Sequence, residues 1–89
     1  MSAADDLFEQ MSRSKAGWTA EDLETLYRGF GFSRREGGKH VVYSHPVHRE
    51  LRATVTRSKS LPVGYIQTAL KLVRRLRELQ RGETDEPRS

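Results

Sequence analysis

The spacing of apolar residues changes twice along this chain of 89 residues, and these changes constrain its fold more than any other feature. From Thr19 onward, apolar residues recur at the three- and four-residue spacing of a helix. Between Leu51 and Thr56 they alternate with polar residues, as in a strand with one buried face. From Pro62 the helical spacing returns and extends to Leu79. Helices and strands in separate stretches are typical of the α+β class.

The intervening stretches predict the remaining elements. We expect a short amphipathic helix around Asp5–Met11, followed by a loop over Ser12–Gly17. Strands are expected over Phe32–Glu36 and His40–Ser44, on either side of Gly37-Gly38, a pair that suits a two-residue hairpin turn. The expected order is helix, helix, three strands, helix. It predicts a three-stranded antiparallel sheet with helices packed on one face.

Two sequence signals mark where helices begin and end. Thr19 followed by Asp22 three residues later is typical of a capping box at the start of the second helix. Gly82 is expected to end the last helix. We therefore predict a single domain over residues 1–82 and a disordered tail over residues 83–89, which contain no apolar side chain.

A two-residue turn at Gly37-Gly38 also predicts how the hairpin strands pair. Arg35 would lie directly opposite His40, and directly paired residues share a face of the sheet. The apolar side chains of the opposite face would be those of Phe32, Val41 and Tyr43. Arg35 and His40 are therefore expected together on the face that the helices leave open.

Charge and cysteine content limit the functions open to the chain. Sixteen lysine and arginine residues against 12 acidic residues give a net charge of +4, which favours polyanionic partners such as RNA. The absence of cysteine excludes disulfides, zinc sites built on thiolates and cysteine nucleophiles. Small secreted domains usually carry disulfides, so we expect a cytoplasmic location. No apolar run approaches the ~20 residues of a membrane-spanning helix, and no membrane partner is expected.

His40 is the candidate catalytic residue. An imidazole titrates near neutral pH and can take the proton of a ribose 2′-hydroxyl or give one to a leaving 5′-oxygen. Arg35 and Lys39 are candidate RNA-binding residues, because a cation beside the histidine can hold the scissile phosphate. The alternative interpretation of His40 is an ordinary exposed histidine on a strand.

Other polar groups offer weaker candidates. Arg57-Ser58-Lys59 lies where the third strand leads into the last helix, and it is either a phosphate-binding loop or a plain connector. The basic residues after Leu70 suit either a solvated helix face or phosphate contacts. His45 and His48 are three residues apart in an expected loop, which favours solvated side chains over metal ligands. No metal or cofactor is predicted.

Four short runs occur in the order and spacing of a known family. They are Gly17-Trp18-Thr19, Gly29-Phe30-Gly31-Phe32, Gly38-Lys39-His40 and Leu61-Pro62-Val63-Gly64-Tyr65. In these runs the chain resembles the HicA toxins of type II toxin–antitoxin pairs, over residues 7–80. The resemblance implies a fold like a double-stranded-RNA-binding domain and metal-independent cleavage of messenger RNA, with His40 at the catalytic position. It also implies a HicB-type antitoxin that covers the active site and represses the operon.

The chain differs from that family pattern at two places. Gly38-Lys39-His40 stands where Gly-Ser-His is usual, and Thr56-Arg57-Ser58 stands where Pro-Arg-His is common. The second difference removes a histidine ahead of the last helix. The leading hypothesis is a toxin-type endoribonuclease with His40 as general acid or base. The alternative is a non-catalytic module of the same fold that binds RNA or a partner protein.

Overall fold

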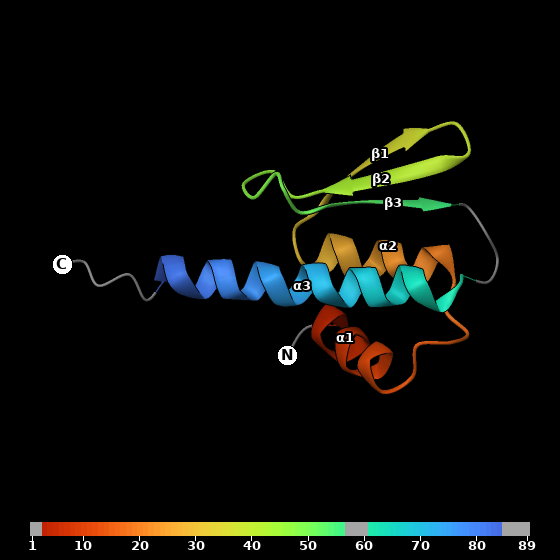
Figure 1. Cartoon of the computed structure of the whole chain (residues 1–89), viewed down its shortest axis with the longest axis horizontal. Helices are drawn as coiled ribbons and strands as arrows, with labels where there is room; N and C mark the ends of the chain where they lie inside the picture. The colour runs from red at the N-terminus through yellow and green to blue at the C-terminus, as the bar shows by residue number, and fades with distance from the viewer. Residues whose placement is uncertain (1–2, 57–60, 85–89) are drawn as a thin grey trace.

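The computed structural model describes residues 3–56 and 61–84 (Figure 1). Its elements in chain order are α1 (Ala3–Arg13), α2 (Ala20–Gly29), β1 (Ser33–Gly37), β2 (His40–Ser44), β3 (Arg52–Thr56) and α3 (Val63–Thr84). The predicted order of elements and the α+β class are confirmed. None of the helices in these two stretches combines the length and apolar character needed to cross a membrane.

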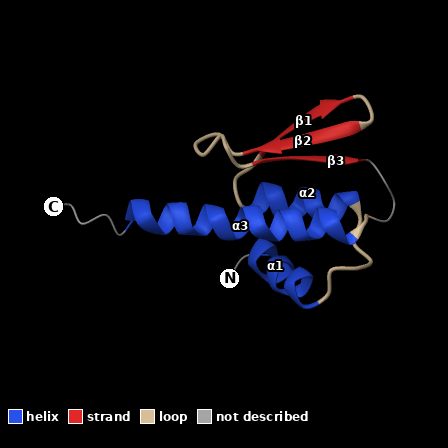
Figure 2. Ribbon diagram, in the orientation of Figure 1, coloured by secondary structure: helices blue, strands red, loops and turns tan. Residues whose placement is uncertain are grey.

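The strands form one antiparallel sheet in the order β1-β2-β3, with β2 in the centre. All three helices lie on the same side of this sheet (Figure 2). Helices α2 and α3 lie next to the sheet, and α1 lies beyond them, on the side away from the strands (Figure 1). No described helix or strand covers the other face of the sheet. The predicted packing of helices on one face is therefore confirmed, with α1 forming an additional outer layer.

The core lies between the helix-facing side of the sheet and α2 and α3. Its largest feature is the stacked pair of Tyr27 from α2 and Tyr43 from β2, whose ring centroids lie 4.5 Å apart. Val41 and Val55 flank this pair from β2 and β3. The last helix contributes a fully buried stripe made of Ile66, Ala69, Leu70, Val73 and Leu76. Burial of these apolar side chains is the main force that holds the helices on the sheet.

The start of α2 follows the predicted capping pattern. The Thr19 hydroxyl accepts a hydrogen bond from the Asp22 backbone N–H at 3.2 Å, and the Asp22 carboxylate accepts one from the Thr19 N–H at 2.9 Å. Two backbone donors that the helix cannot satisfy internally are satisfied in this way.

Helices α1 and α3 are both longer than predicted. Helix α1 includes Ser12 and Arg13, which were expected in a loop, because the buried Met11 anchors its last turn in the core. Helix α3 passes through Gly82 to Thr84, so the prediction that Gly82 ends it is wrong. A glycine ends a helix where it takes a left-handed conformation, and Gly82 does not. The remainder of the predicted tail, residues 85–89, lies outside the described residues.

The hairpin pairing differs from the predicted one by two residues. The turn is formed by Gly38-Lys39, with Gly38 at a φ of 64°, and Gly37 pairs with His40. Arg35 therefore pairs with Val42 and not, as predicted, with His40. Because the shift is an even number of residues, each side chain remains on its predicted face.

Phe32 lies outside the strand in which it was expected. The predicted pairing keeps Phe32 in the strand, opposite Tyr43. In the structure Phe32 precedes β1 and is buried against Tyr27, with ring centroids 5.0 Å apart, and against His45 at 5.4 Å. Phe32 therefore belongs to the core, and the strand pairs of the hairpin begin with Ser33 opposite Ser44.

The contact between α1 and α2 makes a testable prediction. A Cβ added at Gly29 would overlap the Ala4 side chain of α1. Gly29→Ala should therefore lower the free energy of unfolding by about 1–3 kcal/mol, since the buried helix contact cannot expand freely. Gly82→Ala is the matched control, because a Cβ there meets no atom within 4 Å. It should raise stability by up to about 1 kcal/mol. Urea unfolding measures both, and stabilisation by both substitutions would contradict this account of the α1–α2 contact.

Candidate functional site

The face of the sheet away from the helices carries three cross-strand rows, and we call it the open face. From the turn end to the far end, the rows are Gly37–His40–Thr56, Arg35–Val42–Thr54 and Ser33–Ser44–Arg52. None of these nine strand residues is acidic. The open face therefore presents hydroxyls, an imidazole and guanidinium groups to any molecule that lies on it.

His40 is exposed at the turn end of the central strand. Its imidazole has no hydrogen-bond or ionic partner in the part of the chain that the structure describes. Arg35 lies on the same face in the next row, diagonal to His40. Such diagonal positions are about 7–8 Å apart, within reach of a long side chain. Lys39 is exposed in the adjoining turn. The structure thus places His40 and Arg35 in neighbouring rows of the open face and Lys39 in the adjoining turn, although Arg35 and His40 are not directly paired.

The other three predicted RNA-binding residues, Arg57, Ser58 and Lys59, lie outside the described residues. The chain enters this segment from Thr56, the direct partner of His40 across β2 and β3.

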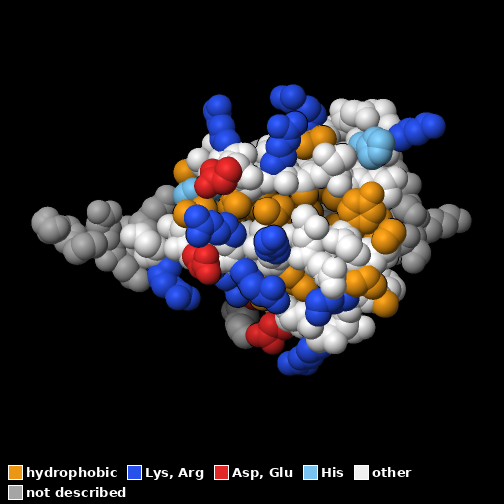
Figure 3. Space-filling view, viewed as in Figure 1, with side chains coloured by type: hydrophobic (Ala, Val, Ile, Leu, Met, Phe, Trp, Pro, Cys, Tyr) orange, Lys and Arg blue, Asp and Glu red, His pale blue; other side chains and the backbone are white. Residues whose placement is uncertain are grey.

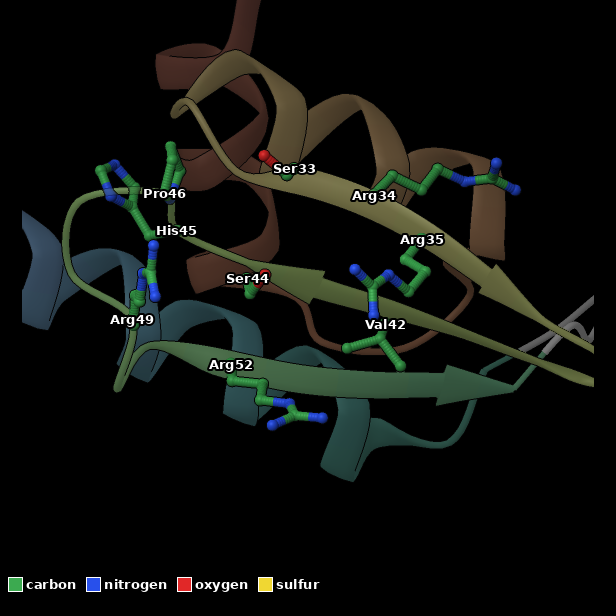
Figure 4. Close-up of a pocket in the computed structure, with 9 residues that line it drawn as sticks. All are labelled: Ser33, Arg34, Arg35, Val42, Ser44, His45, Pro46, Arg49 and Arg52. Carbon is green, nitrogen blue, oxygen red and sulfur yellow. The ribbon is translucent and has the colours of Figure 1, made fainter.

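An open depression of about 520 Å³ occupies the far end of the open face (Figure 4). Its cationic lining consists of Arg34, Arg35, Arg49 and Arg52. Arg35 extends from β1 across β2 toward Val42, whereas Arg34 points away from β2 (Figure 4). Sequence reasoning did not single out Arg49 or Arg52. The alternation of Leu51–Thr56 placed Arg52 on the polar face, but no local pattern indicates where the loop residue Arg49 lies.

The arginines of the molecule fall into two groups. Those of the helices mostly face carboxylates, in the pairs Arg13–Glu9, Arg28–Glu24, Arg75–Glu78 and Arg77–Asp5. Arg34 is also paired: its hydrogen bond to Glu36, with N and O 2.7 Å apart, raises the pKa of its guanidinium, and Glu24 of α2 lies 3.6 Å away. Arg35, Arg49 and Arg52 have no carboxylate partner among the described residues.

Figure 3 shows lysine and arginine side chains spread over both the sheet and the helices in the view of Figure 1. What distinguishes Arg35, Arg49 and Arg52 is therefore the lack of a described carboxylate within ion-pair distance rather than the number of cations. Because uncompensated guanidinium groups favour an anionic ligand, the depression is a candidate binding site for a phosphate or a carboxylate.

Arg77 of α3, in contrast to the arginines of the depression, has both ionic and aromatic partners. Besides its ion pair with Asp5 at 2.7 Å, its guanidinium lies over the rings of Phe8 and Phe30, at 4.7 and 5.2 Å from their centroids. These contacts hold α1 against α3. For Arg77, neither of the two sequence interpretations, a solvated face or a phosphate contact, describes its role.

His45 organises the loop between β2 and β3. Its Nδ1 accepts hydrogen bonds from the backbone N–H groups of Val47 and His48, at 3.2 and 3.1 Å, so the ring proton resides on Nε2. Its ring meets Phe32 edge-on and the side chain is only 7% exposed. Leu51 closes the loop by accepting from the His45 N–H and donating to the His48 carbonyl.

The expectation of a solvated His45 is therefore wrong, because its polar edge satisfies backbone donors and its apolar edge packs on the core. In residues 3–56 and 61–82 no three histidine or carboxylate side chains gather into a group that would suit a metal ion.

The loop role of His45 makes a second prediction. His45→Ala removes the acceptor of two backbone donors and should lower the free energy of unfolding by about 1–3 kcal/mol. It should also speed amide hydrogen exchange at Val47 and His48. The matched control is His40→Ala, which removes an exposed imidazole and should change stability by less than about 0.5 kcal/mol. Equal effects of the two substitutions on unfolding would contradict a structural role for His45.

Comparisons of the chain with protein-family models, with curated proteins and with solved structures found no match.

Proposed function

We propose that the chain is a HicA-like endoribonuclease that cleaves messenger RNA in the cytoplasm without a metal, with His40 as general acid or base. The observation that carries the proposal is the position of His40: an exposed imidazole on a sheet face where Arg35, in the next cross-strand row, has no carboxylate partner among the described residues. The four family-like sequence runs also support it.

The reaction is a transesterification within the RNA. The ribose 2′-oxygen attacks the adjacent phosphorus, and the bond from phosphorus to the 5′-oxygen breaks. The products are a 2′,3′-cyclic phosphate and a free 5′-hydroxyl. His40 takes the proton of the 2′-hydroxyl or gives one to the leaving 5′-oxygen, while water exchanges the other proton. Arg35 and Lys39 offset the negative charge that grows on the phosphate oxygens.

The proposed protein partner is a HicB-like antitoxin that covers the open face. Its contact surface would have to be acidic, because Arg35 and Arg52 need carboxylates or phosphates to balance their charge once water is excluded. Neutralisation then follows from direct obstruction of His40.

A second candidate function is supported by a specific observation. No described acid or base contacts His40, whereas efficient proton transfer usually uses an imidazole that a partner orients. A module that binds RNA or a protein without cleaving it would have the same open face and require no such partner.

The test uses purified full-length protein, single-stranded RNA and a metal chelator. Cleavage that leaves cyclic phosphate ends, and that is lost in His40→Ala, is the expected result. RNA binding without cleavage would contradict the nuclease and support the binding module.

A further inference from the structure

We propose that the arginine-lined depression at the far end of the open face binds a backbone phosphate of the RNA strand whose cleavage site lies at His40. This inference rests on the proposed function and adds a second contact point to it. The residues that carry it are Arg49 and Arg52, with Arg35 between the depression and His40.

The first argument is charge. Arg35, Arg49 and Arg52 line one depression, and none has a carboxylate partner in the described part of the chain. Ser44 adds a hydroxyl at the floor, in the same cross-strand row as Arg52. A guanidinium group presents a planar set of donors that matches the oxygens of a phosphate, and a hydroxyl can donate to a third oxygen.

The second argument is rigidity. Arg49 belongs to a short loop whose backbone is fixed from both sides. The backbone N–H groups of Val47 and His48 donate to the buried His45 ring. The buried Leu51 makes backbone hydrogen bonds with both His45 and His48. Arg52 starts β3 and is held by the sheet. Since both backbones are already ordered, binding an anion costs little beyond fixing the two side chains.

The third argument is position. His40 and Ser44 are four residues apart on β2, which corresponds to about 14 Å along an extended strand. One nucleotide cannot place phosphates at both ends of this distance, but an RNA segment of several nucleotides can. A strand lying along β2 would pass Arg35 on its way between the depression and His40.

The lining favours a nucleic-acid backbone over an acidic protein segment. Centres of protein interfaces are enriched in aromatic and other apolar anchors. The apolar groups of the depression are limited to Val42 and Pro46, and the open-face rows contain no Phe, Tyr or Trp. The lack of a stacking platform also implies that this end of the site holds phosphates without selecting bases.

The experiment measures binding of a fluorescent single-stranded RNA of about a dozen nucleotides, within the range of known single-strand sites. All proteins carry His40→Ala, so that binding is observed without cleavage. Adding Arg49→Ala and Arg52→Ala should weaken binding at low salt by tenfold or more. The slope of log K against log salt should become shallower by about 1.4, which corresponds to two lost phosphate contacts.

A matched control removes the same charge elsewhere. Arg13→Ala with Arg28→Ala also removes two arginines, but both are paired with acids on α1 and α2. The RNA affinity of this control should remain within about twofold of the parent. The charge-conserving pair Arg49→Lys and Arg52→Lys should show the same slope of log K against log salt as the parent. Equal weakening by the two alanine pairs would overturn the proposal, because net charge alone would then explain binding. Poly-glutamate serves as a probe for an acidic protein segment. If the Arg49→Ala and Arg52→Ala pair lost binding to poly-glutamate but bound RNA as the parent does, the proposal would be overturned in favour of an acidic protein.

Cleavage of a dinucleoside monophosphate separates this inference from the proposed function. In proteins that retain His40, the Arg49→Ala and Arg52→Ala pair should lower the cleavage rate of a long RNA by a larger factor than that of this short substrate, which cannot reach from His40 to the depression. If the parent cleaves no RNA but its binding depends on Arg49 and Arg52, the nuclease fails and the phosphate site stands. If the parent cleaves RNA but binding is independent of these arginines, the phosphate site fails alone.

Discussion

His40→Ala is expected to reduce the rate of RNA cleavage by about 10²–10⁴-fold, the usual contribution of one general acid or base. The imidazole is exposed and its partners across the sheet, Gly37 and Thr56, are joined to it through backbone pairing. Its removal should therefore leave the fold and the RNA affinity nearly unchanged. The measurement is the initial rate of cleavage of a labelled oligonucleotide, together with its binding affinity.

Chemical rescue gives this prediction a sharper readout. Because His40 lies on an open face and not in a closed cavity, free imidazole can approach the vacated position. Added imidazole should restore part of the rate of His40→Ala, in proportion to its concentration of neutral base if the residue accepts the 2′-proton. A variant as active as the parent, or one that has lost RNA binding together with cleavage, would contradict the assigned role.

Alkaline pH is expected to destabilise the protein through its stacked tyrosines. Tyr27 is fully buried, and its hydroxyl has no hydrogen-bond partner among the described residues. Burial, reinforced by the neighbouring Tyr43, raises the pKa of the Tyr27 hydroxyl far above its ordinary value of 10.0. Burial also raises the pKa of Tyr43, against the opposing effect of Arg34.

These pKa directions set the sign of the pH dependence. In the unfolded chain both tyrosines lose their protons near pH 10, whereas in the folded protein they remain neutral to higher pH. Above pH 10 the unfolded state therefore binds fewer protons, and the free energy of unfolding falls as pH rises. Each tyrosine contributes a loss of about 1.4 kcal/mol per pH unit until its folded pKa is reached. Below pH 10 this contribution to stability is fully present.

Tyr27→Phe tests both the pKa direction and the unpartnered hydroxyl. It should remove the loss of stability that Tyr27 causes above pH 10 and leave the one that Tyr43 causes. The free energy of unfolding should then fall less steeply with pH. At neutral pH it should raise the free energy of unfolding by about 1 kcal/mol, because a buried hydroxyl without a partner is costly. Urea unfolding at several pH values measures both effects. A loss of stability at neutral pH, or an unchanged alkaline slope, would contradict this description of Tyr27.

The order and type of the elements could be predicted from the sequence, because their signals are local. The capping box at Thr19 and Asp22, the β-forming run His40–Ser44 and the alternation through Leu51–Thr56 each depend on residues a few positions apart. The faces of the strands were also predictable, since an alternating pattern survives any register shift of two residues. The C-terminal end of α3 was harder to predict, because Gly82 is compatible with both a helix interior and a helix end.

The hairpin register, the burial of His45 and the grouping of Arg35, Arg49 and Arg52 could not be predicted before the fold was known. In the observed register Phe32 packs against Tyr27 ahead of the strand, and the position of Arg49 depends on a loop that His45 holds in place. Each of these features results from contacts between residues on different elements. No local pattern encodes them, because they exist only once the core has placed the sheet against the helices.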